Sequence, residues 1–175
     1  YPDFQFRNKQ ALSPAPTYAV NVRTIGGTVS GLSGSGLVLS LSAGSTQTLN
    51  VSANGNFTFA QAVSNAQSYT VTVQTQPTSP TQTCTVTSGT GPAGVANITD
   101  VAVSCTTNTY SVGGTVSGLV GAGAVLSLNA EPLTLPVAAN GAFTFPTALD
   151  SGSSYVVAVQ TQPSAPTQTC TVANA

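Results

Sequence analysis

The chain has 175 residues, only 4% of them charged, and a formal net charge of −1. It contains no His, which excludes histidine-based acid–base catalysis and histidine metal sites. Three basic residues cannot neutralise a phosphate track, so a nucleic-acid surface is excluded. No apolar run approaches the roughly 18 residues of a transmembrane helix. Apolar residues still make up 41% of the chain, which is enough for a core and argues against disorder.

The first 23 residues form a leader that the rest of the chain does not repeat. Apolar and polar residues alternate in Phe4-Gln5-Phe6 and again from Tyr18 through Val20 to Val22. Two prolines interrupt the leader between these segments. The alternation predicts extended, strand-like stretches.

An internal duplication organises the remainder of the chain. Residues 26–32 (Gly-Gly-Thr-Val-Ser-Gly-Leu) recur unchanged at 113–119, and residues 80–86 (Pro-Thr-Gln-Thr-Cys-Thr-Val) recur unchanged at 166–172. Two identical seven-residue runs in the same order indicate two copies of one module. We therefore predict a leader at 1–23, a first module at 24–106 and a second module at 107–175.

Each copy is predicted to consist of short strands. Leu37, Leu39 and Leu41 alternate with Val38 and Ser40. Alternating valines also follow Tyr69 and Tyr155, two tyrosines that we expect to line the core. Asn54-Gly55 predicts a hairpin turn between strands at 49–51 and 57–59, and Asn140-Gly141 repeats it. About seven short strands in ~85 residues favour a β-sandwich. The expected fold class is all-β, with two tandem antiparallel β-sandwich modules behind an extended N-terminal leader.

Two of the three cysteines lie in the first copy. A disulfide between Cys84 and Cys105 would stabilise the first module by about 3 kcal/mol on the chain-entropy model. It would also indicate an oxidising, extracellular or cell-surface compartment. Two buried thiols are the alternative.

Cys170, the counterpart of Cys84, has no partner in the second copy at the spacing of the first. The second module is therefore expected to lack its final strand. Three explanations stay open: a longer repeat array, a sequence cut within the module, or a strand supplied by another subunit. In the third case the donor residues are Phe4, Phe6, Tyr18, Val20 and Val22, and the acceptor edge is formed by Cys170, Thr171 and Val172. Strand addition of this kind uses main-chain pairing.

The chemistry-bearing residues do not suggest an enzyme. The four carboxylates, Asp3, Asp100, Glu131 and Asp150, form no close pair, and no loop gathers the acids that a calcium site needs. No His is present to activate a serine. We expect no catalytic residues, metal or cofactor. Sequons at Asn50, Asn56 and Asn97, together with Thr/Pro-rich stretches, are candidate glycan sites.

The repeated motifs carry a resemblance. The Gly-Gly-Thr-Val-Ser-Gly-Leu run, the Asn-Gly-x-Phe-Thr-Phe motif and the Pro-Thr-Gln-Thr-Cys-Thr-Val run resemble tandem β-sandwich repeats of bacterial secreted and surface proteins. The layout is similar to Ig-like and carboxypeptidase-regulatory-like modules. The resemblance covers about residues 24–175 and implies stalks, spacers, adhesin shafts or polymer subunits, with no catalytic residues.

Together these observations predict a structural subunit of an extracellular bacterial filament or surface fibre. Its partners would be copies of itself, assembled head to tail by β-strand complementation. The near-zero net charge suits such association, because it removes long-range repulsion. The alternative is an adhesin or carbohydrate-binding stalk repeat that is a fragment of a longer surface protein.

Overall fold

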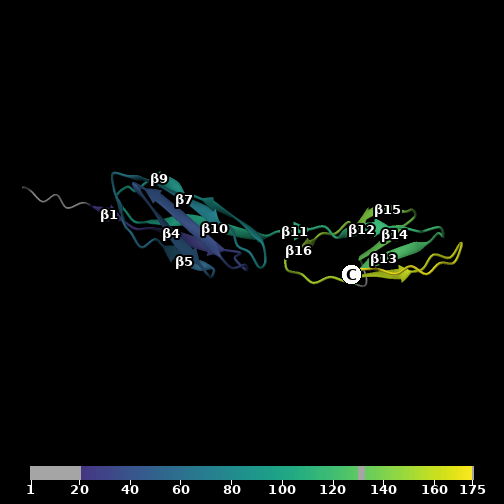
Figure 1. Ribbon diagram of the computed structural model, residues 1–175. Coiled ribbons are helices and arrows are strands. Elements are labelled where there is room, and N and C mark those ends of the chain that lie inside the picture. Colours follow the sequence, from purple (N-terminus) through teal and green to yellow (C-terminus); the bar gives the residue numbers. More distant parts are fainter. Residues whose placement is uncertain (1–20, 130–132, 175) are drawn as a thin grey trace, which may run out of the picture.

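The computed structural model of the protein describes residues 21–129 and 133–174. Every regular element in these residues is a β-strand, so the all-β class is confirmed. The strands gather into two lobes that lie end to end (Figure 1). We call residues 21–107 the first half and residues 109–174 the second half, with Asn108 between them. Each half has its own hydrophobic cluster.

The first half contains ten strands in three sheets. In chain order these are β1 (Val22–Arg23), β2 (Ile25–Ser30), β3 (Leu37–Ala43), β4 (Ser45–Val51), β5 (Gly55–Thr58), β6 (Val63–Ser64), β7 (Ser68–Thr75), β8 (Gln82–Thr87), β9 (Thr90–Pro92) and β10 (Ile98–Thr107). The sheet orders are β5-β2-β10-β8, β4-β3-β7-β9 and β1-β6. Both four-stranded sheets contribute to one cluster, which is consistent with a β-sandwich.

Period-two alternation decides which side chains enter this cluster. Leu37, Leu39 and Leu41 on β3 are fully buried, whereas Val38 and Ser40 between them are half-buried. Burying each leucine is worth about 1.5–3 kcal/mol. The face predicted from the sequence is therefore the one that packs against the core.

Strand β10 fills the middle of the first sheet. It runs antiparallel to β8, with Cys105 beside Cys84, and parallel to β2, with Val103 beside Val29. The prediction of purely antiparallel sheets is therefore wrong at the β2–β10 pair. Strand β10 reaches this sheet by crossing over from β9 in the other sheet, and a crossover connection permits parallel pairing.

The predicted hairpin at Asn54-Gly55 is also wrong. Strand β4 pairs with β3 and strand β5 pairs with β2, so the chain changes sheets at this turn. The Asn54 side chain instead accepts a hydrogen bond from the Leu32 N–H (2.7 Å) and donates one to the Leu32 carbonyl (2.8 Å). Asn140 does the same with Leu119. In each half the asparagine of this dipeptide therefore stabilises a neighbouring loop, because its amide forms hydrogen bonds with the N–H and the carbonyl of a buried leucine.

The described part of the second half contains seven strands. These are β11 (Thr109–Tyr110), β12 (Gly113–Val116), β13 (Ala124–Leu128), β14 (Leu133–Val137), β15 (Gly141–Thr144), β16 (Leu149–Asp150) and β17 (Val157–Thr161). They pair as β11-β16, β12-β15 and β14-β13-β17. The β12–β15 register, with Gly114 beside Phe143, repeats the β2–β5 register, with Gly27 beside Phe57. Among the described residues, no strand takes the places that β9 and β10 have in the first half.

Candidate functional site

The candidate site lies where the second half has no equivalent of β10. In the first half, β10 separates β2 from β8. In the second half, β12 stands at the place of β2 and pairs only with β15. Residues 168–172, which repeat the sequence of the start of β8, form no strand. We call these residues the acceptor segment.

A groove of about 470 Å³ separates β12 from the acceptor segment. One wall is β12 and the other is residues 168–174. The floor is apolar and includes side chains from β13, β14, β15 and β17: Leu126, Val137, Phe143, Val157 and Val159. The residues around the groove therefore include several apolar side chains, together with β12 and residues 168–172, which pair neither with each other nor with a strand between them.

The equivalent glycines Gly27 on β2 and Gly114 on β12 differ in how closely another strand approaches them. A side-chain carbon added at Gly27 would overlap the carbonyl oxygen of Val101, because β10 passes directly against β2. Gly114 is the counterpart of Gly27, and there the nearest atoms are ring carbons of Phe143 at 3.1 Å. The second half therefore has a glycine at the same position, but no backbone atom of a described strand lies against it. Gly113 and Gly114 are exposed, whereas Gly26 and Gly27 are buried.

Glutamine side chains hold the acceptor segment in the position that β8 has. The Gln162 side chain accepts a hydrogen bond from the Cys170 N–H (2.7 Å) and donates one to the Cys170 carbonyl (3.1 Å). Gln76 makes the same pair of bonds to Cys84. Gln168 binds the loop N–H groups of Val120 and Gly121 at 2.7 Å each. These side-chain bonds bind the segment although it pairs with no strand of the described residues.

The cysteines differ between the halves as the sequence predicts. Cys84 and Cys105 form a disulfide that joins β8 to β10. Cys170 is half-buried and has no disulfide partner among the described residues. Its side chain lines the groove. A strand entering the groove as β10 enters the first half would pass beside this thiol.

The predicted donor residues fall mostly outside the described structure. Phe4, Phe6, Tyr18 and Val20 belong to residues 1–20. Val22 lies on β1, where it pairs with Ser64 of its own chain. The predicted acceptor residues Cys170, Thr171 and Val172 line the groove, although they do not form a strand.

The two tyrosines that the sequence predicts to line the core have different environments. Tyr69 is buried, its hydroxyl donates to the Ser88 carbonyl at 3.4 Å, and β9 pairs beside it. Desolvation, with a smaller contribution from the Asp100 carboxylate, raises the pKa of Tyr69. The expectation that Tyr155 lines the core is wrong, because this residue is 47% exposed. No strand equivalent to β9 covers it in the described residues.

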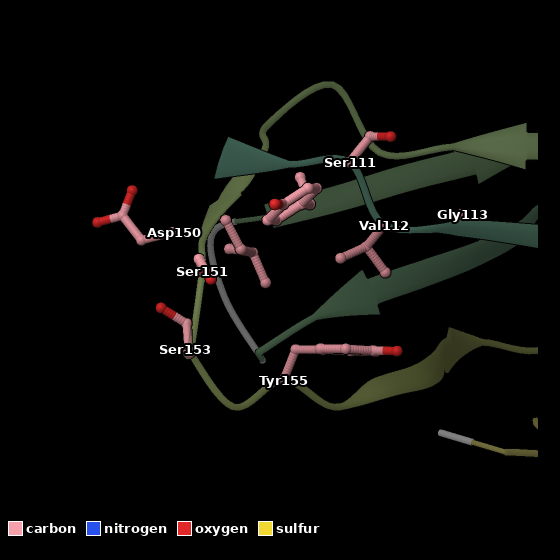
Figure 2. A pocket seen from close by; sticks show the side chains of 10 residues that line it. Ser111, Val112, Gly113, Asp150, Ser151, Ser153 and Tyr155 are labelled. Carbon is pink, nitrogen blue, oxygen red and sulfur yellow. The ribbon is translucent and has the colours of Figure 1, made fainter. Parts of the chain in front are cut away.

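A second, shallower hollow of about 340 Å³ lies beside Tyr155, and the sequence did not indicate it. Tyr110, Val112 and several serines also line it. Figure 2 shows the carboxylate of Asp150 pointing away from Val112 and Tyr155. Exposed aromatic rings beside hydroxyl groups can stack on a sugar. Among the described residues, no strand lies beside Tyr155 as β9 lies beside Tyr69.

The part of the chain that the structure describes shows no arrangement for metal binding. No group of three or more His, Cys, Asp or Glu side chains there could hold a metal ion. Within the same residues, no helix is long and apolar enough to cross a membrane.

Comparison with known proteins adds no identity. No protein-family model matches the chain, and neither a curated protein nor a solved structure matches it.

Proposed function

We propose that the protein is a structural subunit of an extracellular bacterial filament or surface fibre. It would consist of two tandem Ig-like β-sandwich modules, and its copies would join head to tail by β-strand complementation. The groove between β12 and the acceptor segment carries this proposal. In the first half β10 pairs with both β2 and β8, whereas β12 pairs only with β15. The disulfide is compatible with an oxidising compartment.

The donor would be the leader, residues 1–20, of another copy. Asn21 precedes β1 as Asn108 precedes β11. Both carbonyls accept a hydrogen bond from the equivalent turn, Asn21 from the Asn65 N–H (3.0 Å) and Asn108 from the Ser151 N–H (2.8 Å). Because β10 immediately precedes Asn108, residues 11–20 hold the place in sequence that β10 holds. Ten extended residues span about 33 Å, as much as β10 itself.

The leader supplies apolar side chains at the required places. In the repeat frame, Pro14 and Pro16 stand where β10 has Val101 and Val103, and Tyr18 stands where it has Cys105. Proline offers apolar surface to the floor but no N–H, so this strand would make fewer main-chain hydrogen bonds than β10. Binding would then depend mainly on covering the apolar floor.

Electron microscopy of natively purified protein tests the proposal. We expect regular filaments from the full chain and none after residues 1–20 are removed. A shorter truncation, lacking residues 1–10, separates the contribution of Phe4 and Phe6 from that of residues 11–20. Filaments that persist without residues 1–20 would place the contact elsewhere, and monomers from the full chain would contradict the fibre proposal.

A second candidate is a stalk or adhesin repeat that is part of a longer surface protein. Cys170 favours it, because the strand that faces its counterpart Cys84 carries Cys105, whereas residues 1–20 contain no cysteine. The strand completing the groove would then come from further along the same polypeptide. Sugar binding at the hollow beside Tyr155 would be a separate property of such a repeat.

Two peptides distinguish the candidates. One contains residues 95–108, which include β10, and the other contains residues 1–20. Each is added to the protein, and both thermal stability and the mass of a disulfide adduct at Cys170 are measured. The second candidate predicts stabilisation and an adduct with the β10 peptide only. The first predicts that the leader peptide stabilises the protein and shortens filaments.

A further inference from the structure

The boundary between the two halves is a hydrogen-bonded junction around Asn108. The Asn108 N–H donates to the Thr81 carbonyl at 3.0 Å, and the Asn108 carbonyl accepts from the Ser151 N–H at 2.8 Å. The Thr83 hydroxyl donates to the Asn108 side-chain oxygen at 2.8 Å. One residue therefore binds both halves, with β10 ending directly before it and β11 starting directly after it.

A second set of contacts joins the halves beside Asn108. The Thr81 N–H donates to the Ser151 hydroxyl at 2.9 Å, and the two hydroxyl oxygens also lie 2.9 Å apart. A side-chain carbon added at Gly152 would lie 3.5 Å from the Pro80 ring, in ordinary contact. Residues 80–83, which lie at the side of the first half that faces the second, thus contact the turn at residues 151–152. We call residues 80–83 the tail surface, and we call Asn108 together with residues 151–152 the head surface.

The repeat places a second tail surface at the free end of the second half. Residues 166–169 have the same sequence as residues 80–83. The Gln168 N–H donates to the Pro163 carbonyl at 3.2 Å, as the Gln82 N–H does to the Pro77 carbonyl. Thr167 corresponds to Thr81. The two turns therefore share this closing hydrogen bond, although Thr167 also forms an isolated bridge with Ser164.

A second head surface lies at the opposite end of the molecule. The Asn65 N–H donates to the Asn21 carbonyl, as the Ser151 N–H donates to the Asn108 carbonyl. The following turns also match, because the Gln67 N–H binds the Ser64 carbonyl at the same 3.0 Å as the Ser153 N–H binds the Asp150 carbonyl. One difference is that Gly152 has a φ of +86° and Ala66 has no positive φ.

Within the described residues, burial differs between the internal pair of surfaces and the outer pair. Pro80 and Thr81 are half-buried at the junction, whereas Pro166 and Thr167 are exposed. Asn21 and Asn65 are exposed as well. In the part of the chain that the structure describes, a tail surface at one end and a head surface at the other are therefore both exposed, and we call them the free surfaces.

We infer that the free tail surface binds the free head surface of a second copy through the contacts of the internal junction. The Thr167 N–H donates to the side-chain oxygen of Asn65 in the next copy, in place of the Ser151 hydroxyl. The Asn21 N–H of that copy donates to the Thr167 carbonyl. A contact between unlike surfaces leaves both outer ends free, so it propagates into a rod.

This inference rests on the proposed function only in requiring that copies associate. The contact that it names, between the tail and head surfaces, differs from strand complementation in the groove. The tail surface shares Gln168 and Thr169 with the lining of the groove, whereas Thr167, Asn21 and Asn65 lie outside that lining. Residues 1–20 are not part of the end-to-end surfaces. The two contacts are compatible, since Asn21 at the head surface brings the residues before it to the mouth of the neighbour's groove.

The test uses two full-length variants that each block one end. Thr167→Arg places a large charged side chain on the tail surface, and Asn65→Arg places one on the head surface. Thr48→Arg, at an exposed position on β4 away from both surfaces, is the matched control. Circular dichroism and the intact Cys84–Cys105 disulfide confirm folding, and mass photometry measures assembly.

We expect each blocking variant alone to associate at least about tenfold more weakly than the control. A mixture of the two should form one heterodimer and nothing longer, because only one matching pair of free surfaces remains. Unchanged polymers from either variant, or monomers from the mixture or from the unaltered chain, would overturn the inference. Filaments that survive Thr167→Arg but are lost without residues 1–20 would leave strand complementation standing and refute only the end-to-end contact.

Discussion

The Cα atoms of Cys84 and Cys105 lie 3.9 Å apart on neighbouring antiparallel strands, and their sulfur atoms are bonded. This bond fixes β10 to β8 in the middle of the first sheet. The second half has the cysteine of one strand and, among the described residues, lacks the other strand. The difference between the halves yields the following predictions.

Removal of the disulfide should destabilise the first half. A Cys84→Ser, Cys105→Ser double variant is expected to lose about 3 kcal/mol of unfolding free energy, because the unfolded chain regains the entropy of an open loop. Urea denaturation followed by circular dichroism measures the loss. Cys170→Ser is the control and should change the stability by less than about 0.5 kcal/mol, since no bond is removed. Equal losses in both variants would contradict this account.

Alanine substitution should lower the unfolding free energy by different amounts at the equivalent glycines Gly27 and Gly114. Gly27→Ala is expected to cost about 2–3 kcal/mol, because the added methyl overlaps the Val101 backbone, which cannot move without disturbing β10. Gly114→Ala meets only the Phe143 ring and should cost under about 1 kcal/mol. Denaturation curves of the two variants test this difference. If Gly114→Ala leaves assembly unchanged, no strand approaches β12 as β10 approaches β2.

The equivalent glutamines provide a second matched pair. Gln82 is 1% exposed, and its side chain binds the backbone of Ser33, Gly34 and Gly31. Gln82→Ala leaves these groups unpaired and should cost about 2–4 kcal/mol. Gln168→Ala removes similar bonds at a half-buried site, where water replaces them, so its cost should be under half as large. Similar costs in urea denaturation would show that burial does not set the penalty.

Stability should fall at alkaline pH because of Tyr69. Its pKa in the folded protein is raised, chiefly by desolvation and further by Asp100, so the folded state keeps the proton more tightly than the unfolded state. This contribution is fully present below the unfolded pKa of about 10 and is lost as the pH rises from there through the folded pKa. Unfolding free energies measured from pH 8 to pH 11.5 test it, with Tyr69→Phe as the control. A decline of equal size in that variant would assign the effect to other groups.

The strand faces and the disulfide could be predicted from sequence because they depend on local pattern. Leu37, Leu39 and Leu41 alternate with a period of two, and that period decides which side chains share a face. Cys84 and Cys105 were the two cysteines within one copy. The hairpin at Asn54-Gly55 failed because the same dipeptide suits any tight turn, and whether a chain returns to its own sheet or crosses to the other depends on packing of distant strands.

From the sequence, the groove could be predicted only as the absence of a final strand in the second module. Its walls, its floor and the glutamines that hold residues 168–172 became visible when β12 and that segment were placed in space. Tyr155 was misplaced for the same reason, since the burial of an aromatic side chain is decided by what covers it and not by its own strand.

The sequence by itself determined the all-β class, the duplication, the buried strand faces and the cysteine pair, because alternation, identity and spacing are properties of the chain. Only the tertiary structure decided which strands are neighbours, that β10 lies parallel to β2, and that Asn108 joins two docked ends. These depend on contacts between residues far apart in the chain, where shape and burial across the whole fold select one pairing among many that the local pattern allows.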